Sequence, residues 1–318
     1  MKIVVLDASP ANDGDLSWKG LEDLGNLTIY SRTAPDEVVE RCRDAEAVFS
    51  NKVVLNAEII AALPKLKFIG VLATGYNNID IEAARKHGVT VCNVPAYSTD
   101  SVAQLVFALL LEVTNRVSDY SASVKRGDWA NCPVFSYRLA PITELSGKTM
   151  GIIGFGNIGL RVGTIAKAFG MTVITNSQRD LPEWVERVKL DELLSRSNVV
   201  SLNSALTPKT HHIINEETLG LMRPDAILIN TSRGALVDEA ALTAALRRRQ
   251  IAAAAIDVME QEPPREDSPL MECDNCFITP RTRRTPPRSP KCGSRRIWTT
   301  TASSRPILPG KALRLGNG

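Results

Sequence analysis

Short apolar runs rich in β-branched residues alternate with amphipathic stretches along most of this chain, and this alternation constrains the fold more than any other feature. Five runs occupy residues 2–8, 27–30, 47–51, 68–74 and 89–94, and six more occupy residues 149–156, 171–176, 198–205, 226–232, 251–258 and 276–279. Apolar strands separated by helices need crossover connections, which produce a parallel sheet buried on both faces. At 318 residues the chain is also long enough for two cores. We therefore predict an α/β fold with two Rossmann-like parallel-sheet domains.

One long helix is predicted between the two series, over residues 100–126. Its middle, LVFALLL, is apolar on every side, and five apolar residues share one face of the helix: Val102, Leu105, Val106, Leu109 and Val113. A helix of this kind must be buried on most sides. We expect it to lie both between the domains and at a subunit interface.

The composition, with 44% hydrophobic and 23% charged residues, is that of a globular protein. No apolar run reaches the ~18 residues that cross a bilayer, and the first residues do not resemble a signal peptide. The six cysteines mostly lie far apart, which is typical of reduced thiols and predicts a cytoplasmic protein. Cys273 and Cys276 form a CxxC pair, but no second ligand pair stands at zinc-binding spacing, so we expect no metal there.

The sequence GFGNIG directly follows the apolar run TMGII and directly precedes a helical stretch. In this context a GxGxxG motif predicts a dinucleotide-binding turn, in which the glycines allow a tight turn, close approach of the pyrophosphate and packing of helix on strand. The N-terminus of the helix then faces the phosphates. The predicted cofactor-binding residues of this motif are Gly154, Gly156, Asn157, Ile158 and Gly159.

The group that binds the adenosine ribose should lie about twenty residues further on, after the next strand. Ser177, Gln178 and Arg179 stand there in place of the aspartate that would select NAD. A neutral serine beside an arginine suits a 2′-phosphate, so NADP(H) is favoured over NAD(H). Two alternatives stay open, because Arg179 could be a solvated charge and Asp180 could reach the ribose.

With these residues in place, the chain resembles the D-2-hydroxyacid dehydrogenase family, and within it the glycerate dehydrogenase or hydroxypyruvate reductase branch. The resemblance is carried by several blocks in the same order, namely LATGYNNID, VPAYSTDSVAQ, GKTMGIIGFGNIG, LTPKTHHIIN, INTSRGALVDEAAL, AAIDVMEQEPP and NCFITP. It implies a flavodoxin-like substrate domain whose first part is 1–98 and an NAD(P)-binding Rossmann domain at 99–280. Residues 281–318 form an atypical basic tail where the family's substrate domain would return.

The resemblance also implies roles for individual residues. Arg233 would bind the substrate carboxylate and polarise the carbonyl, which suits a guanidinium fork. Glu262 would orient a catalytic histidine and raise its pKa. The neighbouring Glu260 would not have this role. Thr74, Gly75 and Tyr76 look like a backbone-amide cradle for the substrate carboxylate. Apart from the resemblance, we expect substrate choice to depend on the loop at Asn51 and Lys52 and on residues 75–77, with aromatic walls from Phe135 or Tyr137.

Further residues would line the cofactor by the same resemblance. They are Thr207, Pro208, Thr231, Ser232 and Asp257, of which Asp257 would bind the nicotinamide carboxamide. Each of them could alternatively be a strand-end cap.

The proton donor of the family is missing from its usual position. The family's histidine follows the ITP block, whereas here Pro280 is followed by Arg281, which holds its proton too tightly to donate it. The chain has only three histidines. His87 is expected to be a capping or surface residue, while His211 and His212 lie in the cofactor-side loop and are weak candidates for the acid.

The composition changes at the same point. Residues 281–318 carry ten Lys or Arg and no Asp or Glu, whereas residues 1–280 have a formal net charge of −7. Such a segment cannot build a core, and it predicts either a basic tail that could bind nucleic acid without sequence preference or a shifted reading frame near codon 280.

The genetic code favours the shift. Residues 297–304 can be encoded so that a frame starting at the third base of the Ile297 codon reads Leu-Asp-Asn-Tyr-Arg-Lys-Leu, an amphipathic stretch like the family's last helix. In that frame an Arg codon ending in C followed by Thr yields His, which both Arg281-Thr282 and Arg284-Thr285 permit. We therefore expect a frameshift, and with it impaired activity.

The predicted function is NAD(P)H-dependent reduction of a small 2-keto acid, hydroxypyruvate or glyoxylate, with D-glycerate oxidation as the reverse reaction. The alternative is a catalytically inactive, dinucleotide-binding sensor of the corepressor type. Loss of the histidine favours this alternative, whereas retention of Arg233 and Glu262 argues against it. We expect a homodimer, no membrane partner and no sequence-specific nucleic acid partner.

Overall fold

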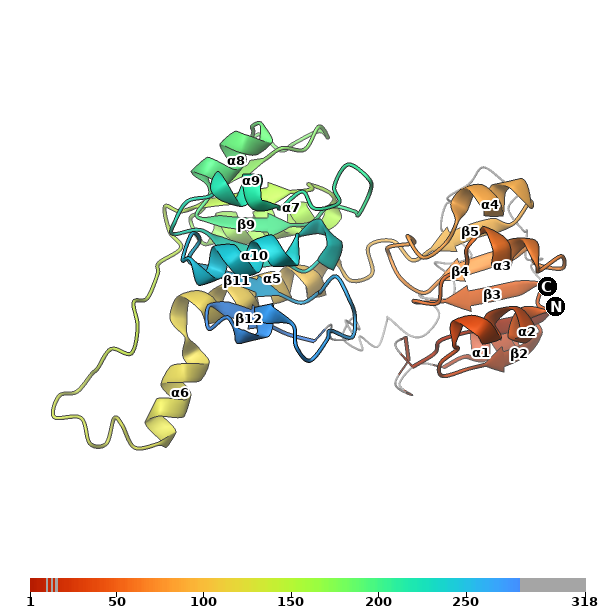
Figure 1. Ribbon diagram of the computed structural model, residues 1–318, viewed down its shortest axis with the longest axis horizontal. Coiled ribbons are helices and arrows are strands. Elements are labelled where there is room, and N and C mark those ends of the chain that lie inside the picture. Colours follow the sequence, from red (N-terminus) through yellow and green to blue (C-terminus); the bar gives the residue numbers. More distant parts are fainter. Residues whose placement is uncertain (10, 13, 15–16, 281–318) are drawn as a thin grey trace. The chain divides into compact units, whose positions relative to one another are not determined.

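The computed structural model describes residues 1–9, 11, 12, 14 and 17–280 of the chain. These residues form two compact units whose boundary falls between Ser98 and Thr99 (Figure 1). The basic segment 281–318, with the predicted frameshift and the position of the missing histidine, lies outside the described residues. Among the described residues, no helix combines the length and the apolar character that crossing a membrane requires.

Unit 1, residues 1–98, contains a five-stranded sheet in the order β2-β1-β3-β4-β5, in which every pairing is parallel. Its strands are β1 (Lys2–Val5), β2 (Asn26–Ile29), β3 (Ala47–Ser50), β4 (Phe68–Val71) and β5 (Thr90–Asn93). Its helices are α1 (Lys19–Glu22), η1 (Pro35–Glu37), α2 (Val38–Cys42), α3 (Ala57–Ala61) and α4 (Ile81–Lys86). This strand order is that of flavodoxin-like folds, in which ligands bind where the order reverses, here between β1 and β3.

Both faces of this sheet are buried because alternate side chains of each strand point to opposite faces. In β1, Val4 belongs to one apolar cluster and Ile3 and Val5 belong to the other, and all three side chains are fully buried. The uninterrupted apolar runs in the sequence reflect this double burial. Asn56 and Asp80 are the N-cap residues of α3 and α4, and their side chains accept hydrogen bonds from the backbone N–H groups three residues on.

Unit 2, from Thr99 onward, contains a seven-stranded parallel sheet in the order β12-β11-β10-β9-β6-β7-β8. Its strands are β6 (Thr149–Ile153), β7 (Thr172–Thr175), β8 (Val185–Arg187), β9 (Val199–Leu202), β10 (Ile227–Asn230), β11 (Ala253–Ile256) and β12 (Cys276–Ile278). The order reverses between β6 and β9, as in dinucleotide-binding folds. The predicted fold class is therefore confirmed, and only the three-residue β8 escaped prediction, because it is too short to show a period.

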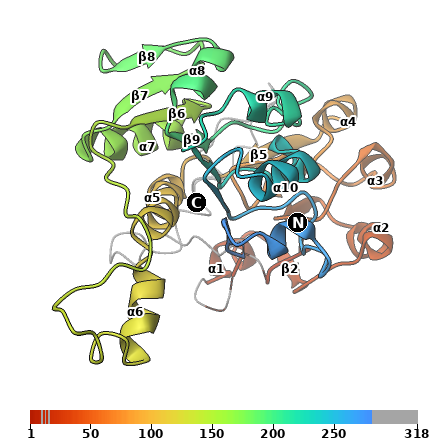
Figure 2. The same cartoon turned by 60° about the vertical axis from the view of Figure 1, so that its left-hand side comes forward.

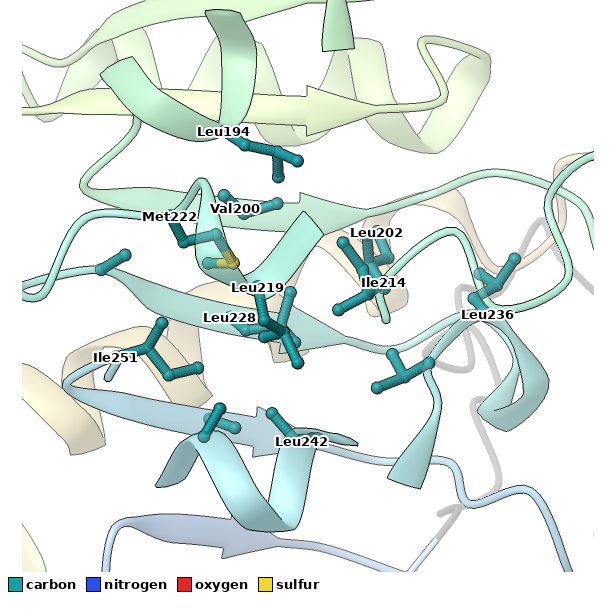
Figure 3. Packing of buried hydrophobic residues seen from close by; sticks show 14 of the residues in the cluster. Leu194, Val200, Leu202, Ile214, Leu219, Met222, Leu228, Leu236, Leu242 and Ile251 are labelled. Atoms are coloured by element: carbon teal, nitrogen blue, oxygen red, sulfur yellow. The ribbon is translucent and has the colours of Figure 1, made fainter. Parts of the chain in front are cut away.

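Helices cover both faces of this second sheet. They are α5 (Thr99–Asn115), α6 (Val117–Lys125), α7 (Asn157–Ala168), α8 (Leu190–Arg196), α9 (Glu216–Gly220), η2 (Gly234–Leu236), α10 (Glu239–Arg247) and η3 (Pro269–Glu272). Side chains from α8, α9 and α10 form one cluster with the sheet, in which Leu219, Leu228 and Leu242 lie together (Figure 3). The opposite face packs against α5 and α7.

The predicted single helix over residues 100–126 is wrong, because the chain forms two helices separated by Arg116. Arg116 adopts the left-handed conformation, with φ of 52°, and the Glu112 carboxylate accepts a hydrogen bond from the backbone N–H of Ser118 in the new helix. Helix α5 is well buried, and its Phe107 stacks on Phe169 at 5.3 Å between ring centroids. In α6, by contrast, Ser123 alone is buried, so the second half of the predicted helix does not belong to the core.

Candidate active site

The glycine loop has the geometry of a dinucleotide-binding turn. Gly154 follows β6 with φ of 92°, and Gly156 is the N-cap residue of α7. A Cβ atom on Gly154 would lie 2.5 Å from the backbone nitrogen of Ser204, and one on Gly159 would overlap the Gly154 carbonyl oxygen. A Cβ on Gly156 would meet only an Arg179 side-chain nitrogen at 3.8 Å, so the space above the N-terminus of α7 is open to a phosphate.

Gly154→Ala should therefore destabilise unit 2 by about 2 to 4 kcal/mol, since both the positive φ and the contact with Ser204 oppose a side chain. Gly147→Ala is the matched control, because Gly147 also has a positive φ, 73°, but has no atom within 4 Å of the added Cβ. It should cost only about 1 to 2 kcal/mol. Equal losses in urea unfolding of the two variants would show that the contact with Ser204 is unimportant.

Three buried polar side-chain atoms gather on the other side of the strand-order reversal. Asn203 Oδ1, Ser204 Oγ and Thr231 Oγ1 have no hydrogen-bond partner within the described structure. They follow β9 and β10, whose carboxyl ends lie at the same sheet edge as the glycine loop. Buried polar atoms of this kind need a partner, which a ligand at the switch point can provide. The arrangement therefore fits a dinucleotide.

Of these three residues the sequence predicted only Thr231. Asn203 and Ser204 were not predicted from the sequence. The signal that could have identified them is that both are polar and directly follow the fully buried strand β9. Ser232, which was predicted to line the cofactor, donates its hydroxyl hydrogen to the Leu202 carbonyl oxygen at 2.9 Å. Its side chain thereby ties the end of β10 to the end of β9.

The predicted ribose end lies after β7. Ser177 Oγ accepts a 3.3 Å hydrogen bond from the backbone N–H of Arg179, and the Arg179 carbonyl oxygen accepts one of 2.5 Å from Arg187. Beside them is an open pocket of about 580 Å³ lined by Asn176, Gln178, Arg187, Val188, Lys189, Leu190 and Glu192. Three cationic side chains, those of Arg179, Arg187 and Lys189, therefore stand around this end of the sheet. Asp180 is exposed.

Arg233 stands in a tightly organised turn after β10. The buried Asn230 side chain donates to the Arg233 carbonyl oxygen at 2.8 Å and accepts from the Ser232 N–H at 3.1 Å. A Cβ on Gly234 would overlap the backbone of Met259 and Glu260, so the turn packs directly on the loop after β11. The backbone of Arg233 is thus held from both sides while its side chain stays partly exposed.

Asp257 and Glu262 belong to that neighbouring loop. Asp257 is buried directly after β11, and its carboxylate accepts a 2.9 Å hydrogen bond from the Thr279 hydroxyl. Glu262 is exposed further along the loop. Because β10 and β11 are paired in parallel, the structure brings Arg233 and Asp257 to one sheet edge, and Glu262 lies further along the loop whose Met259 and Glu260 pack against Gly234.

The loop after β9 carries Thr207, Pro208 and the two adjacent histidines. Thr210 closes it, because its hydroxyl accepts from the Thr207 N–H at 2.8 Å and donates to the Ala205 carbonyl at 2.7 Å. His212 lies 2.8 Å from the Glu260 carboxylate through its Nε2 atom. His87, in unit 1, is the C-cap residue of α4, and the prediction of a capping residue is confirmed.

In unit 1 the predicted substrate-binding residues follow two paired strands. Asn51 and Lys52 follow β3, and Thr74, Gly75 and Tyr76 follow β4. The Asn51 amide donates to the Leu72 carbonyl at 3.0 Å, and the Thr74 hydroxyl donates to the Val94 carbonyl at 3.0 Å. The Thr74 side chain is therefore engaged within unit 1.

A residue that the sequence did not single out organises this edge. Asp7, which follows β1 and is 4% exposed, accepts hydrogen bonds from the backbone N–H groups of Asn51 at 2.7 Å, Lys52 at 2.5 Å and Val53 at 3.2 Å. Burial raises the pKa of the Asp7 carboxyl, although these three hydrogen bonds act in the opposite direction. The sequence feature that could have identified Asp7 is a carboxylate directly after an apolar strand.

Comparison with known proteins agrees with this geometry. Residues 107–282 match the family model of the D-isomer specific 2-hydroxyacid dehydrogenase NAD-binding domain. The chain is 43% identical over 298 residues to a hydroxypyruvate reductase of Blautia hydrogenotrophica, covering 92% of each protein, and 40% identical over 252 residues to a glycerate dehydrogenase of Methylorubrum extorquens, covering 79% of each.

A solved structure extends the comparison to three dimensions. An NADPH-dependent glyoxylate/hydroxypyruvate reductase from Sinorhizobium meliloti, in complex with NADP and malonate, superposes with a TM-score of 0.77 at 25% identity, covering 94% of this chain and 90% of that one. The family match, the identity to the relatives and the two parallel sheets agree. The chain belongs to the D-isomer specific 2-hydroxyacid dehydrogenase family and is an oxidoreductase of that family.

Proposed function

We propose that the chain reduces a small 2-keto acid, hydroxypyruvate or glyoxylate, to the D-2-hydroxy acid, with D-glycerate oxidation as the reverse reaction. The observation that carries the proposal is the turn after β10, in which Asn230 holds the backbone of Arg233. This turn packs against the loop after β11, which contains Asp257 and Glu262. It lies on the same sheet edge as the glycine loop. Relatives named hydroxypyruvate reductase and glycerate dehydrogenase support the substrate class.

The chain's own residues have separate roles in this proposal. Arg233 grips the substrate carboxylate in two places and holds the keto carbon in position. Backbone amides at Thr74, Gly75 and Tyr76 bind the same carboxylate, and Asn51 and Lys52 select the substrate. The glycine loop, with Thr207, Pro208 and Thr231, holds a nicotinamide dinucleotide, which supplies the hydride when bound. Asp257 orients its carboxamide, and Glu262 orients the proton donor.

We further propose that NADP(H) is preferred over NAD(H). The cations Arg179, Arg187 and Lys189 gather at the end of β7, where a 2′-phosphate would lie. The pocket there is also lined by Glu192, which pairs with Arg196. The Sinorhizobium meliloti neighbour carries NADP in its structure.

The double variant Ser177→Asp, Arg179→Ala should reverse this preference. The kcat/KM ratio of NADPH to NADH should fall by about tenfold or more, because the new carboxylate accepts from ribose hydroxyls and repels a 2′-phosphate. Arg223→Ala is the control, since Arg223 pairs with Asp225 elsewhere in unit 2. An unchanged ratio in the double variant would contradict this placement of the 2′-phosphate.

The proton donor is expected to be encoded in the alternative reading frame near codon 280, beyond the described residues. DNA sequencing across codons 275–300 tests this step directly, and an intact, unshifted frame would refute it. The activity of the chain as written is tested by following consumption of NADPH, and then of NADH, with hydroxypyruvate and glyoxylate. If both the chain as written and the chain with the repaired frame bind the cofactor but do not reduce either keto acid, the sensor alternative is favoured.

We also propose that the protein is a cytoplasmic homodimer that associates through α6 and residues 126–147. Figure 2 shows this segment projecting away from the sheet of unit 2. Its side chains include large apolar residues that are more than half exposed: Val117, Trp129, Val134, Phe135 and Ile142. Exposed apolar patches of this kind are typical of subunit interfaces. The free thiols of the described cysteines support the cytoplasmic assignment.

Phe135→Ser should weaken the dimer. Phe135 is 90% exposed in the single chain, and loss of an aromatic anchor raises the dissociation constant of an interface by about tenfold or more. Light scattering across a dilution series should show twice the chain mass for the native protein and dissociation of the variant at higher concentration. Val54→Ser, at an exposed position of unit 1, is the control. A native protein that is monomeric at micromolar concentration would refute the dimer.

A further inference from the structure

Three potential metal ligands meet where the loop after β9 approaches the loop after β11. One nitrogen each from His211 and His212 and one carboxylate oxygen of Glu260 all lie within 4.8 Å of one another. The two imidazole rings stack with 3.9 Å between their centroids, and His212 Nε2 is 2.8 Å from Glu260 Oε1. Within the described residues this is the one group of three or more His, Cys, Asp or Glu side chains with such spacing.

The backbone at this cluster is anchored by residues that are not ligands. The His212 N–H donates to the Ala235 carbonyl at 2.9 Å, and the His212 carbonyl oxygen accepts from the Asn215 amide at 3.1 Å. The Glu260 N–H donates to a Glu239 carboxylate oxygen at 2.6 Å. Both loops are therefore held in place, so only the side chains have to adjust when an ion binds.

The donor set selects the kind of ion. Two imidazole nitrogens and one carboxylate oxygen suit Zn²⁺ and similar divalent transition metals, whereas Mg²⁺ and Ca²⁺ prefer oxygen ligands alone. Bonds of about 2.1 Å around a tetrahedral ion place ligand atoms roughly 3.4 Å apart. The present separations can close to this value by side-chain rotation, because His211 and Glu260 are exposed and His212 is partly exposed. Solvent or an added ligand would take the fourth position.

The pair Cys273 and Cys276, at which the sequence predicted no metal, is less suited to a metal than the histidine cluster. Cys276 is partly buried, and burial raises the pKa of its thiol to about 12, which opposes the thiolate that a metal requires. The Cys273 thiol is buried as well, and it donates to the Pro269 carbonyl oxygen. Accessibility and protonation both favour the histidine cluster.

We propose that His211, His212 and Glu260 form a binding site for one divalent transition metal ion, best matched by Zn²⁺. The ion cross-links the loop after β9 to the loop after β11. Glu260 is two residues from Glu262, and its backbone packs against Gly234, next to Arg233. Bound metal therefore also slows turnover, a consequence that rests on the proposed function, whereas the binding itself does not.

The test is a titration of the full chain with Zn²⁺ against a chromophoric chelator, together with thermal unfolding at fixed Zn²⁺ concentrations. We expect saturation at one ion per chain and a melting temperature that rises with Zn²⁺ concentration. His211→Ala and Glu260→Gln should each weaken binding by about tenfold or more, since even the loss of a group behind a ligand costs that much. Saturation well above one ion, or no binding at micromolar Zn²⁺, would overturn the proposal.

His87→Ala is the matched control, because it removes a histidine from unit 1 and leaves the same number of histidines as His211→Ala. Its zinc affinity should equal that of the native chain, and equal affinities in His87→Ala and His211→Ala would refute the assignment. His211→Ala should fold normally, because the His211 side chain is exposed. Zinc binding without inhibition would leave the site intact and contradict only its link to catalysis.

Discussion

Arg233→Lys should lower kcat/KM for hydroxypyruvate by about 10²- to 10³-fold, and Arg233→Ala by more. Lysine keeps the positive charge but not the two parallel N–H donors that grip a carboxylate and fix the keto carbon. Loss of one such donor from a preorganised site commonly costs about 3 to 4 kcal/mol in the transition state. Steady-state kinetics with saturating NADPH measures the effect.

The geometry of the turn makes this a clean experiment. Asn230 contacts the backbone of Ser232 and Arg233, and Gly234 makes the packing contact with the next loop, so most of the turn is held without the guanidinium, which adds one hydrogen bond to the Ser232 carbonyl oxygen at 2.8 Å. The variant should melt at the native temperature and bind cofactor with native affinity. Arg247→Lys, on the outer side of α10 and paired with Glu272, is the control and should change kcat/KM by less than about twofold. A similarly small effect at Arg233 would show that the substrate carboxylate binds elsewhere.

Repair of the reading frame near codon 280 should raise the rate of hydroxypyruvate reduction by about 10²- to 10⁴-fold, the usual contribution of a positioned general acid. The shifted frame can encode a histidine at Arg281-Thr282 or at Arg284-Thr285. Such a residue titrates near neutrality and can donate the proton that the alkoxide needs when hydride arrives. The measurement compares kcat of the chain as written with kcat of the repaired chain at saturating NADPH.

A third protein separates loss of the acid from loss of folded structure. The repaired chain with glutamine in place of its new histidine keeps the restored segment and lacks only the proton donor. It should turn over as slowly as the chain as written. If the chain as written already matches the repaired protein, another group donates the proton, and His211 and His212 are the residues to replace first.

The sheets show how far the sequence could predict the fold. A strand buried on both faces, such as β9 with the sequence VVSL, is apolar at nearly every position, so its type and approximate bounds are visible in the amino acids alone. Strand β8 is not, because only one of its three residues, Val185, is buried. The prediction of a single helix over residues 100–126 was wrong because the sequence pattern does not show the break. Periodicity continues through Arg116, and the break is set by the left-handed backbone of that single residue.

The candidate site divides in the same way. The glycine loop is visible in the sequence because backbone geometry alone demands glycine at Gly154 and Gly159. Arg233, Asp257 and Glu262 were assigned through family resemblance, and the common sheet edge of Arg233 and Asp257 follows from the parallel pairing of β10 with β11. Asp7 was missed because its partners are the amides of residues 51–53, more than forty positions away.

By itself the sequence determined most of the element types, the dinucleotide-binding turn and, through the family resemblance, the class of reaction, because each depends on local backbone chemistry or on blocks of contiguous residues. Only the tertiary structure decided which polar groups meet. It showed that Asp7 holds the Asn51 loop, that Asn203 and Ser204 join Thr231 at the switch point, and that two histidines share a corner with Glu260. The physical reason is that parallel pairing brings distant loops to one sheet edge, so the strand order sets these contacts and the spacing along the chain does not.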